Sequence, residues 1–212
     1  MDRRKALRNI GLSAGFMAAS PGLLSLLQSC KSEVATWVPE HLTPEQGAVV
    51  RAITDVILPA TDTPSASAVN VPEFIDKYIA SGISEREQKF FQWALDGVVK
   101  DLKASYGAIS DVSTENYVAF LNTHLRDAHK KAGDLTTRAR SYEEAMDRGE
   151  MVDGDAEAVN HYALKTLRGF AVFAYTNSEM VGEEVLAYDP VPGSYSGCES
   201  LDELTGGKAW SL

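Results

Sequence analysis

The chain has 212 residues, of which 30 are acidic and 20 are basic, and its formal net charge is −10. Phosphate backbones and anionic lipid headgroups repel a protein this acidic, so nucleic acid is excluded as a partner and so is membrane binding through a basic patch. The only two cysteines, Cys30 and Cys198, are too few for a metal cluster or a redox motif.

Residues 1–30 have the layout of an export signal. A basic head that contains Arg3 and Arg4 precedes a mildly apolar segment, residues 10–27, and a small residue stands before a candidate cleavage point. The arginine pair resembles a twin-arginine signal, which exports proteins that have already folded. Glycine, serine and proline interrupt the apolar segment. They favour this signal over a retained transmembrane helix, which is the alternative, because about 18 mixed residues are at the lower limit for spanning a bilayer.

Residues 27–30 resemble a lipobox, in which Cys30 receives a diacylglycerol and becomes the first residue of the mature protein. Removal of the signal takes away four basic residues and one acidic residue, which leaves 16 basic and 29 acidic residues and a net charge of −13. A body of this charge does not bind anionic membranes unaided, so we expect the lipid on Cys30 to anchor it. Residues 31–41 are short and polar, and we interpret them as a tether. The predicted location is the periplasm, at the membrane.

About 180 residues remain after the signal, which is enough for one domain with a single core. The pattern of residues 42–187 predicts that this domain is helical. Thr43 and Gln46 form a capping-box pattern around Pro44, and Pro59 ends the first helix. A second, short helix starts at Val71 and ends at Gly82. A third follows another capping box, Ser84 to Glu87, and stops at Gly107.

The second half of this domain is predicted to contain two or three more helices. Ser113 caps a fourth helix, which we expect to end at Gly133. From residue 134 to 155 charged side chains dominate, which predicts a solvated helix near 137–148 that leaves the body instead of joining the core. A fifth core helix begins near Asp155, and residues 178–187 either continue it or form a short helix of their own. No segment alternates as a strand does, so the predicted fold is all-α, a compact bundle of about five to six helices.

Residues 188–212 form a tail of different character. Proline, glycine, serine and tyrosine are frequent and apolar periodicity is lost. Such a segment offers little apolar area to offset the entropy of ordering, so we expect it to lie on its own body or on a partner. If Cys30 is lipidated, Cys198 is left alone, and the alternatives are a buried unpaired thiol that packs as a small apolar side chain and a bridge to another chain. The residues expected to make contacts or a disulfide between subunits are Tyr188, Pro190, Pro192, Gly193, Tyr195 and Cys198.

A search for catalytic and metal-binding patterns gives no site. His124 and His129 are five residues apart, whereas a zinc pair on a helix needs four, and the single pair of Glu157 and His161 does not make a metal site. A nucleophile elbow, a dinucleotide-binding glycine motif and a phosphate loop are absent from the sequence. Caps or turns explain three aspartates at least as well as catalysis does: Asp55, Asp62 and Asp76. The aromatic stripes Phe90–Phe91 and Phe170–Tyr175 have helical spacing and are predicted to be core.

Two segments resemble the small subunit (subunit 3) of membrane-associated gluconate 2-dehydrogenase and its relatives. The first runs from Leu42 through Thr43-Pro44-Glu45-Gln46 and residues 53–64 to Val71-Pro72-Glu73-Phe74-Ile75-Asp76, and it departs from the family at Ser65, where glycine is more frequent. The second is residues 188–195 followed by Gly197 and Cys198. With the twin-arginine leader, these segments match the family's layout over nearly the whole chain.

The resemblance implies a non-catalytic subunit that binds a large FAD-dependent dehydrogenase of the glucose–methanol–choline type. In such complexes the large subunit holds the flavin, and the small one carries the export signal for both. A cytochrome or another acceptor then takes the electrons. The substrate is a sugar, a polyol or a sugar acid. The alternative is a stand-alone envelope lipoprotein whose helical domain binds a small ligand or another envelope protein.

Overall fold

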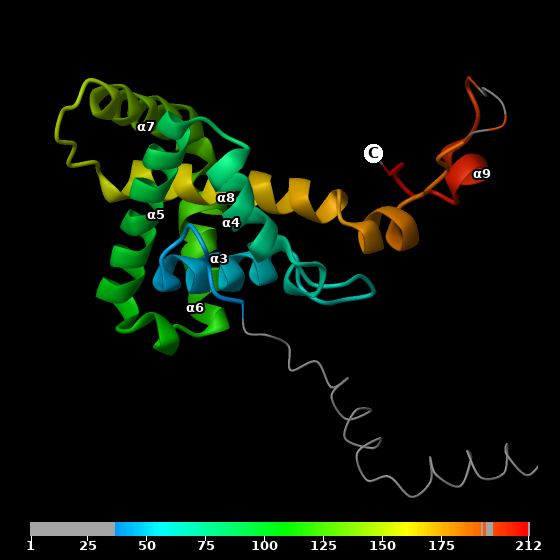
Figure 1. Ribbon diagram of the computed structural model, residues 1–212, viewed down its shortest axis with the longest axis horizontal. Coiled ribbons are helices and arrows are strands. Elements are labelled where there is room, and N and C mark those ends of the chain that lie inside the picture. The colour runs from blue at the N-terminus through cyan, green and yellow to red at the C-terminus, as the bar shows by residue number, and fades with distance from the viewer. Residues whose placement is uncertain (1–36, 192, 194–196, 212) are drawn as a thin grey trace, which may run out of the picture. The chain divides into compact units, whose positions relative to one another are not determined.

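A computed structural model describes residues 37–191, 193 and 197–211 (Figure 1). The predicted export signal with Arg3, Arg4 and Cys30 lies outside the described residues, as do most of the tether, Pro192 and Tyr195. The folded unit begins at Val38. Within the described ranges, no helix has both the length and the apolarity that a membrane span requires.

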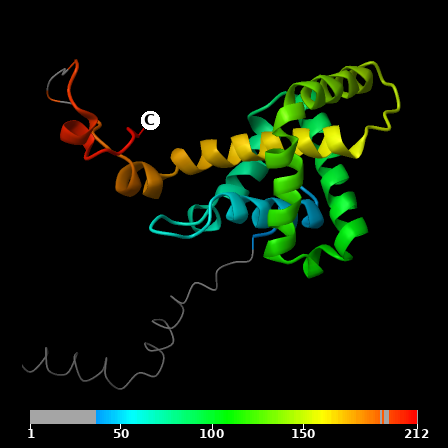
Figure 2. The same cartoon turned by 180° about the vertical axis from the view of Figure 1, so that it is seen from behind.

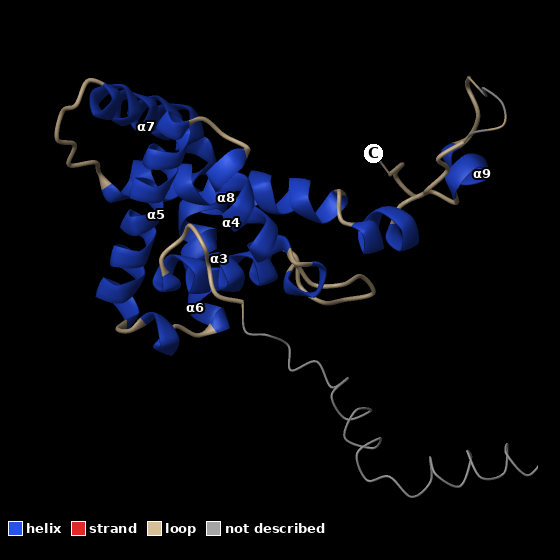
Figure 3. Cartoon of the chain, viewed as in Figure 1, coloured by secondary structure: helices blue, strands red, loops and turns tan. Residues whose placement is uncertain are grey.

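The described structure is helical, and Figure 3 draws no strand in it, so the predicted all-α bundle is confirmed. The α-helices are α3 (Pro44–Ile57), α4 (Val71–Ser81), α5 (Glu85–Tyr106), α6 (Thr114–Leu121), α7 (Ala132–Asp147), α8 (Ala156–Thr176) and α9 (Leu201–Thr205). Shorter helical turns are η1 (Ser67–Val69), η2 (Ile109–Asp111), η3 (Asn122–Arg126), η4 (Asp127–Lys131) and η5 (Val181–Val185).

Helix α8 lies at the centre of the bundle. It packs against α3, α4, α5 and α7, and it runs through the middle of the helices in both views (Figure 1, Figure 2). Ala163, Leu164, Leu167 and Ala171 are fully buried and recur every three or four positions, so they form an apolar stripe along one face, which the buried Asn160 continues toward the start of the helix. Burial of each leucine stabilises the fold by about 1.5–3 kcal/mol.

Helices α3 and α5 begin with the capping hydrogen bonds that the sequence predicts. The Thr43 hydroxyl accepts a hydrogen bond from the Gln46 N–H at 3.2 Å, and the Gln46 side chain accepts one from the Thr43 N–H at 2.9 Å. Ser84 and Glu87 repeat this reciprocal pair at the start of α5. Each cap is worth about 1 kcal/mol. Both predicted capping boxes are confirmed.

The predicted helix end at Gly133 is wrong. The π-turn η3 and the 3₁₀ turn η4 follow α6 directly and lead into α7, so Gly133 lies in the first turn of that helix. Gly107, which does end α5, has φ +91°, whereas Gly133 is not among the glycines with positive φ. A positive φ at glycine is one common way for a helix to end, and the sequence does not show which glycine adopts it.

The prediction that the charged region leaves the body is also wrong. Helix α7 starts earlier than expected and packs against α8, with Leu135 and Ala139 buried. These two residues are four positions apart, so they lie on the same face of the helix. Only these two residues of α7 are fully buried, and many charged residues surround them in the sequence, so the pattern did not show the buried face.

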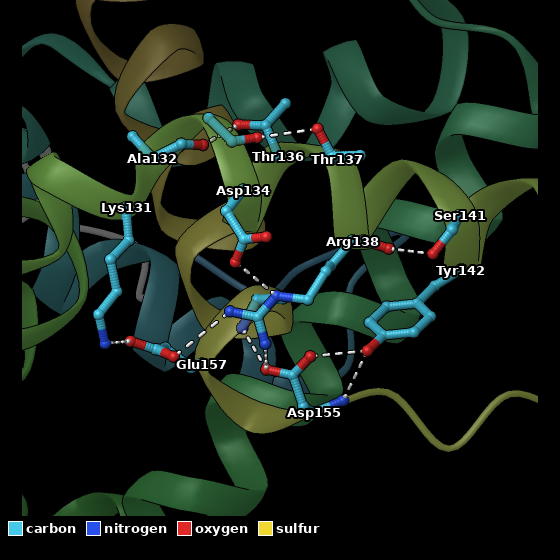
Figure 4. A network of polar contacts seen from close by, with 12 residues as sticks. Lys131, Ala132, Asp134, Thr136, Thr137, Arg138, Ser141, Tyr142, Asp155 and Glu157 are labelled. Atoms are coloured by element: carbon cyan, nitrogen blue, oxygen red, sulfur yellow. Dashed lines mark hydrogen bonds and ion pairs between the residues drawn. The ribbon is translucent and has the colours of Figure 1, made fainter.

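A polar network joins α7 to the start of α8 (Figure 4). The Arg138 guanidinium lies 3.0 Å from the Asp134 carboxylate, 2.9 Å from Asp155 and 3.4 Å from Glu157. The Tyr142 hydroxyl donates to Asp155 at 2.6 Å. Burial raises the pKa of Asp155, but hydrogen bonds from Tyr142 and from the backbone, together with the charge of Arg138, lower it below its usual value overall. The ionised Asp155 can therefore serve as the N-cap of α8 as well as a partner of α7.

Candidate subunit interface

The carboxylate of Asp76 fixes the entry of the chain into the bundle. It accepts backbone N–H bonds from Glu40 at 2.7 Å, His41 at 3.1 Å and Leu42 at 2.8 Å. Asp76 is only 1% exposed, and Leu42 is buried in the core beside it. This aspartate therefore has a structural role, and its three donors hold the segment before α3 against α4.

Asp55 has a similar role in the loop between α3 and α4. Its carboxylate accepts bonds from the backbone N–H of Ser67 at 2.9 Å and from the Ser67 hydroxyl at 2.6 Å. The Tyr175 hydroxyl of α8 donates to the carbonyl of Pro64 at 2.8 Å and fixes the same loop from the other side. Asp62 is exposed in this loop. The segment from α3 to α4 thus forms a frame whose polar residues hold the backbone in place.

Two histidines meet where α6 gives way to irregular turns. Nδ1 of His161 lies 2.8 Å from the carbonyl oxygen of His124 and therefore donates to it. His161 is 4% exposed, and the His124 ring lies on Phe120 with 4.4 Å between ring centroids. Burial lowers the pKa of His124, although the charges of Asp101 and Glu157 oppose this effect. Glu157, which shares a helix with His161, pairs with Lys131 and Arg138.

Among the described residues, no group of three or more His, Cys, Asp or Glu side chains has an arrangement that would hold a metal ion. The burial of His161 and the contact between the His124 and Phe120 rings make the histidine pair part of the packing at the core edge.

We predict that His124 makes the fold sensitive to mild acid. Its pKa is lower in the folded state than in the unfolded chain, so the unfolded chain binds the proton first as the pH falls below about 6.5. The free energy of unfolding should fall from that pH downward and level off below the folded-state pKa. Urea unfolding between pH 7.5 and pH 5 should show this slope, and His124→Gln should reduce it. His129→Gln, which alters an exposed histidine, is the matched control; an equal reduction there would contradict the assignment.

One shallow cleft lies between α5 and the start of α8. It encloses about 220 Å³, and its lining includes Trp93, Asp96, Asp101, Gly154 and Asn160. Two of its carboxylates already accept hydrogen bonds within the chain, since Asn160 donates to Asp101 at 2.7 Å and Gln46 donates to Asp96 at 2.8 Å. These bonds connect helices to one another, so the acidic lining has a structural explanation.

Four of the six residues that the sequence assigns to contacts between subunits lie among the described residues, and all four are exposed. Tyr188 is 53% exposed, and Pro190 and Gly193 are exposed. Cys198 is exposed and has no disulfide partner among the described residues, so the alternative of a buried thiol is wrong. No described residue from 188 to 211 is buried. The chain returns at its end, where Ala187 and Trp210 form an isolated parallel bridge. The structure thus places the described tail candidates together on an exposed segment.

Sequence reasoning missed two features here. The tail contains the five-residue helix α9, whose Leu201 and Leu204 are exposed. The aromatic stripe of α8 was predicted to be core, and that is wrong for its middle, because Val172 is 45% and Phe173 is 47% exposed. The signal that would have found this surface is a lack of charge, since no charged residue occurs between Arg168 and Glu179.

Comparison with known proteins identifies a family but no individual relative. No match is found among curated proteins or among solved structures. A family model described as gluconate 2-dehydrogenase subunit 3 matches residues 44–193, which extend from the start of α3 into the tail. The family consists of accessory subunits of a FAD-dependent dehydrogenase complex. The chain belongs to the gluconate 2-dehydrogenase subunit 3 family.

Proposed function

We propose that this chain is the non-catalytic small subunit of an exported, flavin-dependent dehydrogenase of the glucose–methanol–choline type. It stabilises the large flavoprotein subunit and carries the twin-arginine signal that exports both. The observation that carries the proposal is the family match, which covers most of the chain and includes the helical body as well as the first part of the tail.

The exposed tail supports a binding role for the chain. The tail exposes apolar side chains that a partner surface would bury, among them Tyr188 and Val191. Exposed apolar side chains of this kind are typical of a surface that another protein covers.

In this proposal the large subunit holds FAD and oxidises a sugar, a polyol or a sugar acid. Electrons then pass to an acceptor such as a cytochrome. Lipid on Cys30 anchors the complex to the membrane on the periplasmic side. Cys198 is exposed, so it is available for a disulfide to the large subunit.

Co-purification from the native cells tests the proposal. An affinity tag after residue 212 should recover a flavoprotein whose absorbance shows bound flavin and whose mass identifies it as a dehydrogenase. Deleting this chain should lower the amount of that flavoprotein in the periplasm. Recovery of the chain alone, without flavin, would instead favour the stand-alone lipoprotein. Non-reducing electrophoresis of the same sample shows whether Cys198 bridges the subunits, with Cys198→Ser as the control.

A further inference from the structure

The second half of α8 carries an uncharged stripe on its exposed side. Gly169, Val172, Phe173 and Thr176 have the spacing i, i+3, i+4 and i+7, so they lie along one side of the helix. The first three are exposed and Thr176 is half-buried. An exposed helix face in an acidic protein normally carries charge, so an uncharged stripe with two large apolar side chains indicates a surface for a partner.

Helix α4 extends this stripe into a cluster of aromatic side chains. The ring of Phe173 lies 6.0 Å from that of Phe74 and 5.8 Å from that of Tyr78, measured between centroids. Phe74 is 39% exposed even though Phe173 and Tyr78 surround it. The two helices pack side by side (Figure 1). Aromatic side chains that are held by neighbours and still half-exposed are typical anchors of protein interfaces, because little entropy is lost when a partner covers them. We name this surface, formed by Phe74, Tyr78, Gly169, Val172 and Phe173, the α4–α8 face.

No contact among the described residues explains why position 169 is a glycine. A Cβ atom added there would meet nothing within 4 Å, and its φ is not positive. At Gly97, by contrast, an added Cβ would lie 2.8 Å from a methyl group of Val159, so close packing of helices explains that glycine. Glycine inside a helix is destabilising relative to alanine. At Gly169 it leaves the backbone of α8 open to close approach from outside.

One end of the α4–α8 face is acidic. A hollow of about 320 Å³ lies between the start of α4 and the segment after α8. Its lining includes Asn70, Met180, Glu179, Glu183 and Glu184. A second copy of this chain would bring the same carboxylates and the same net charge, and anionic lipid would also be repelled. The occupant therefore has an apolar patch flanked by basic side chains.

We infer that the large dehydrogenase subunit packs on the α4–α8 face, with its backbone or small side chains over Gly169 and its basic residues opposite Glu183 and Glu184. This inference rests on the proposed function, which supplies the partner. It adds the surface and the chemistry of recognition. Phe74 and Phe173 are the apolar anchors, and Gly169 is the point of closest approach.

The test measures the flavin that co-elutes with tagged small subunit after expression of the whole complex. Gly169→Leu should raise the urea midpoint of the free subunit, since leucine favours a helix and nothing occupies the space. The same change should lower co-eluted flavin at least tenfold. Gly133→Leu is the matched control, because a Cβ atom added at that helical glycine would also meet nothing within 4 Å and the residue lies on α7. A more stable subunit that loses its partner is not explained by misfolding.

Two further substitutions test the anchors and the charge. Phe173→Asp should abolish co-elution, whereas Val118→Asp, at an exposed apolar position on α6, should leave it unchanged. Glu183→Lys should reduce co-elution several-fold, and Glu144→Lys, an exposed glutamate of α7, should not.

The controls also separate the failure of this inference from the failure of the proposed function. If the unaltered subunit recovers no flavoprotein, both the proposed function and the inference about the α4–α8 face are refuted. If it recovers the flavoprotein and the Gly169→Leu and Phe173→Asp variants recover as much, only the α4–α8 face is refuted. A free subunit that sediments as a dimer until Gly169→Leu makes it monomeric would assign the face to a second copy. Loss of binding to neutral lipid vesicles in Phe173→Asp, with flavoprotein recovery intact, would assign it to the membrane. Either result overturns the inference.

Discussion

Replacing Asp76 with alanine should lower the free energy of unfolding by about 3 kcal/mol, because a hydrogen bond to a charged group contributes about 1.5–3 kcal/mol and three backbone donors lose their acceptor. Glu40 and His41 are exposed, so water replaces the carboxylate for their N–H groups. The N–H of Leu42 is buried and stays unpaired. The better helix propensity of alanine within α4 offsets about 0.5 kcal/mol of the loss.

Urea unfolding of the purified protein measures this effect. Asp76→Asn keeps one acceptor oxygen and should cost about half as much, since part of the hydrogen bonding survives. Asp62→Ala changes an exposed aspartate of the same family-like segment and should stay within about 0.5 kcal/mol of the unaltered protein. Equal stabilities for Asp76→Ala and Asp62→Ala would show that Asp76 does not hold the entry segment.

Local signals in the sequence were enough to place most helix starts. Thr43, Ser84, Ser113 and Asp155 all cap helices in the structure, because a cap depends on a side chain and a backbone N–H two or three residues away. Gly82 and Gly107 also follow the ends of helices as predicted. The residues that make these local interactions lie within four or five consecutive positions, so the sequence shows them directly.

Features set by distant partners were harder to predict. Leu121, Leu125 and Ala128 have the spacing of one continuous helix, yet the chain there adopts π and 3₁₀ turns. This segment packs on α8, and His161 of α8 donates a hydrogen bond to the carbonyl of His124 within it. A periodic pattern shows which residues share a face, and it does not show whether another helix covers that face.

The candidate surface illustrates the same limit. Phe170 and Phe173 are three residues apart and were assigned together to the core, but Phe170 is half-buried and Phe173 is more exposed. Among the aromatic rings of the described residues, Phe170 contacts Phe91 of α5 and Tyr78 of α4, whereas Phe173 contacts Phe74 and Tyr78, both of α4. The core therefore gives way to the candidate interface where the aromatic residues of α8 no longer contact α5, and the sequence alone does not show where that point lies.

Replacing both Arg3 and Arg4 with lysine should leave the large dehydrogenase subunit in the cytoplasm and reduce periplasmic dehydrogenase activity to background. The substitutions keep the positive charge of the leader, so attraction to the anionic membrane surface is unchanged. The planar guanidinium is lost, and with it the paired hydrogen-bond donors that lysine does not reproduce. Export of a folded pair depends on recognition of this signal, because in the proposed function the large subunit has none of its own.

Fractionation followed by flavin measurement in each compartment gives the result. Arg8→Lys is the matched control, since it makes the same chemical change outside the arginine pair and should leave both subunits in the periplasm. In the double variant the assembled pair should accumulate in the cytoplasm, where the tagged small subunit still recovers the flavoprotein. That outcome would separate export from assembly. Normal export of the large subunit in the double variant would refute the escort role while leaving binding through the α4–α8 face as a separate question, which the Gly169→Leu comparison answers.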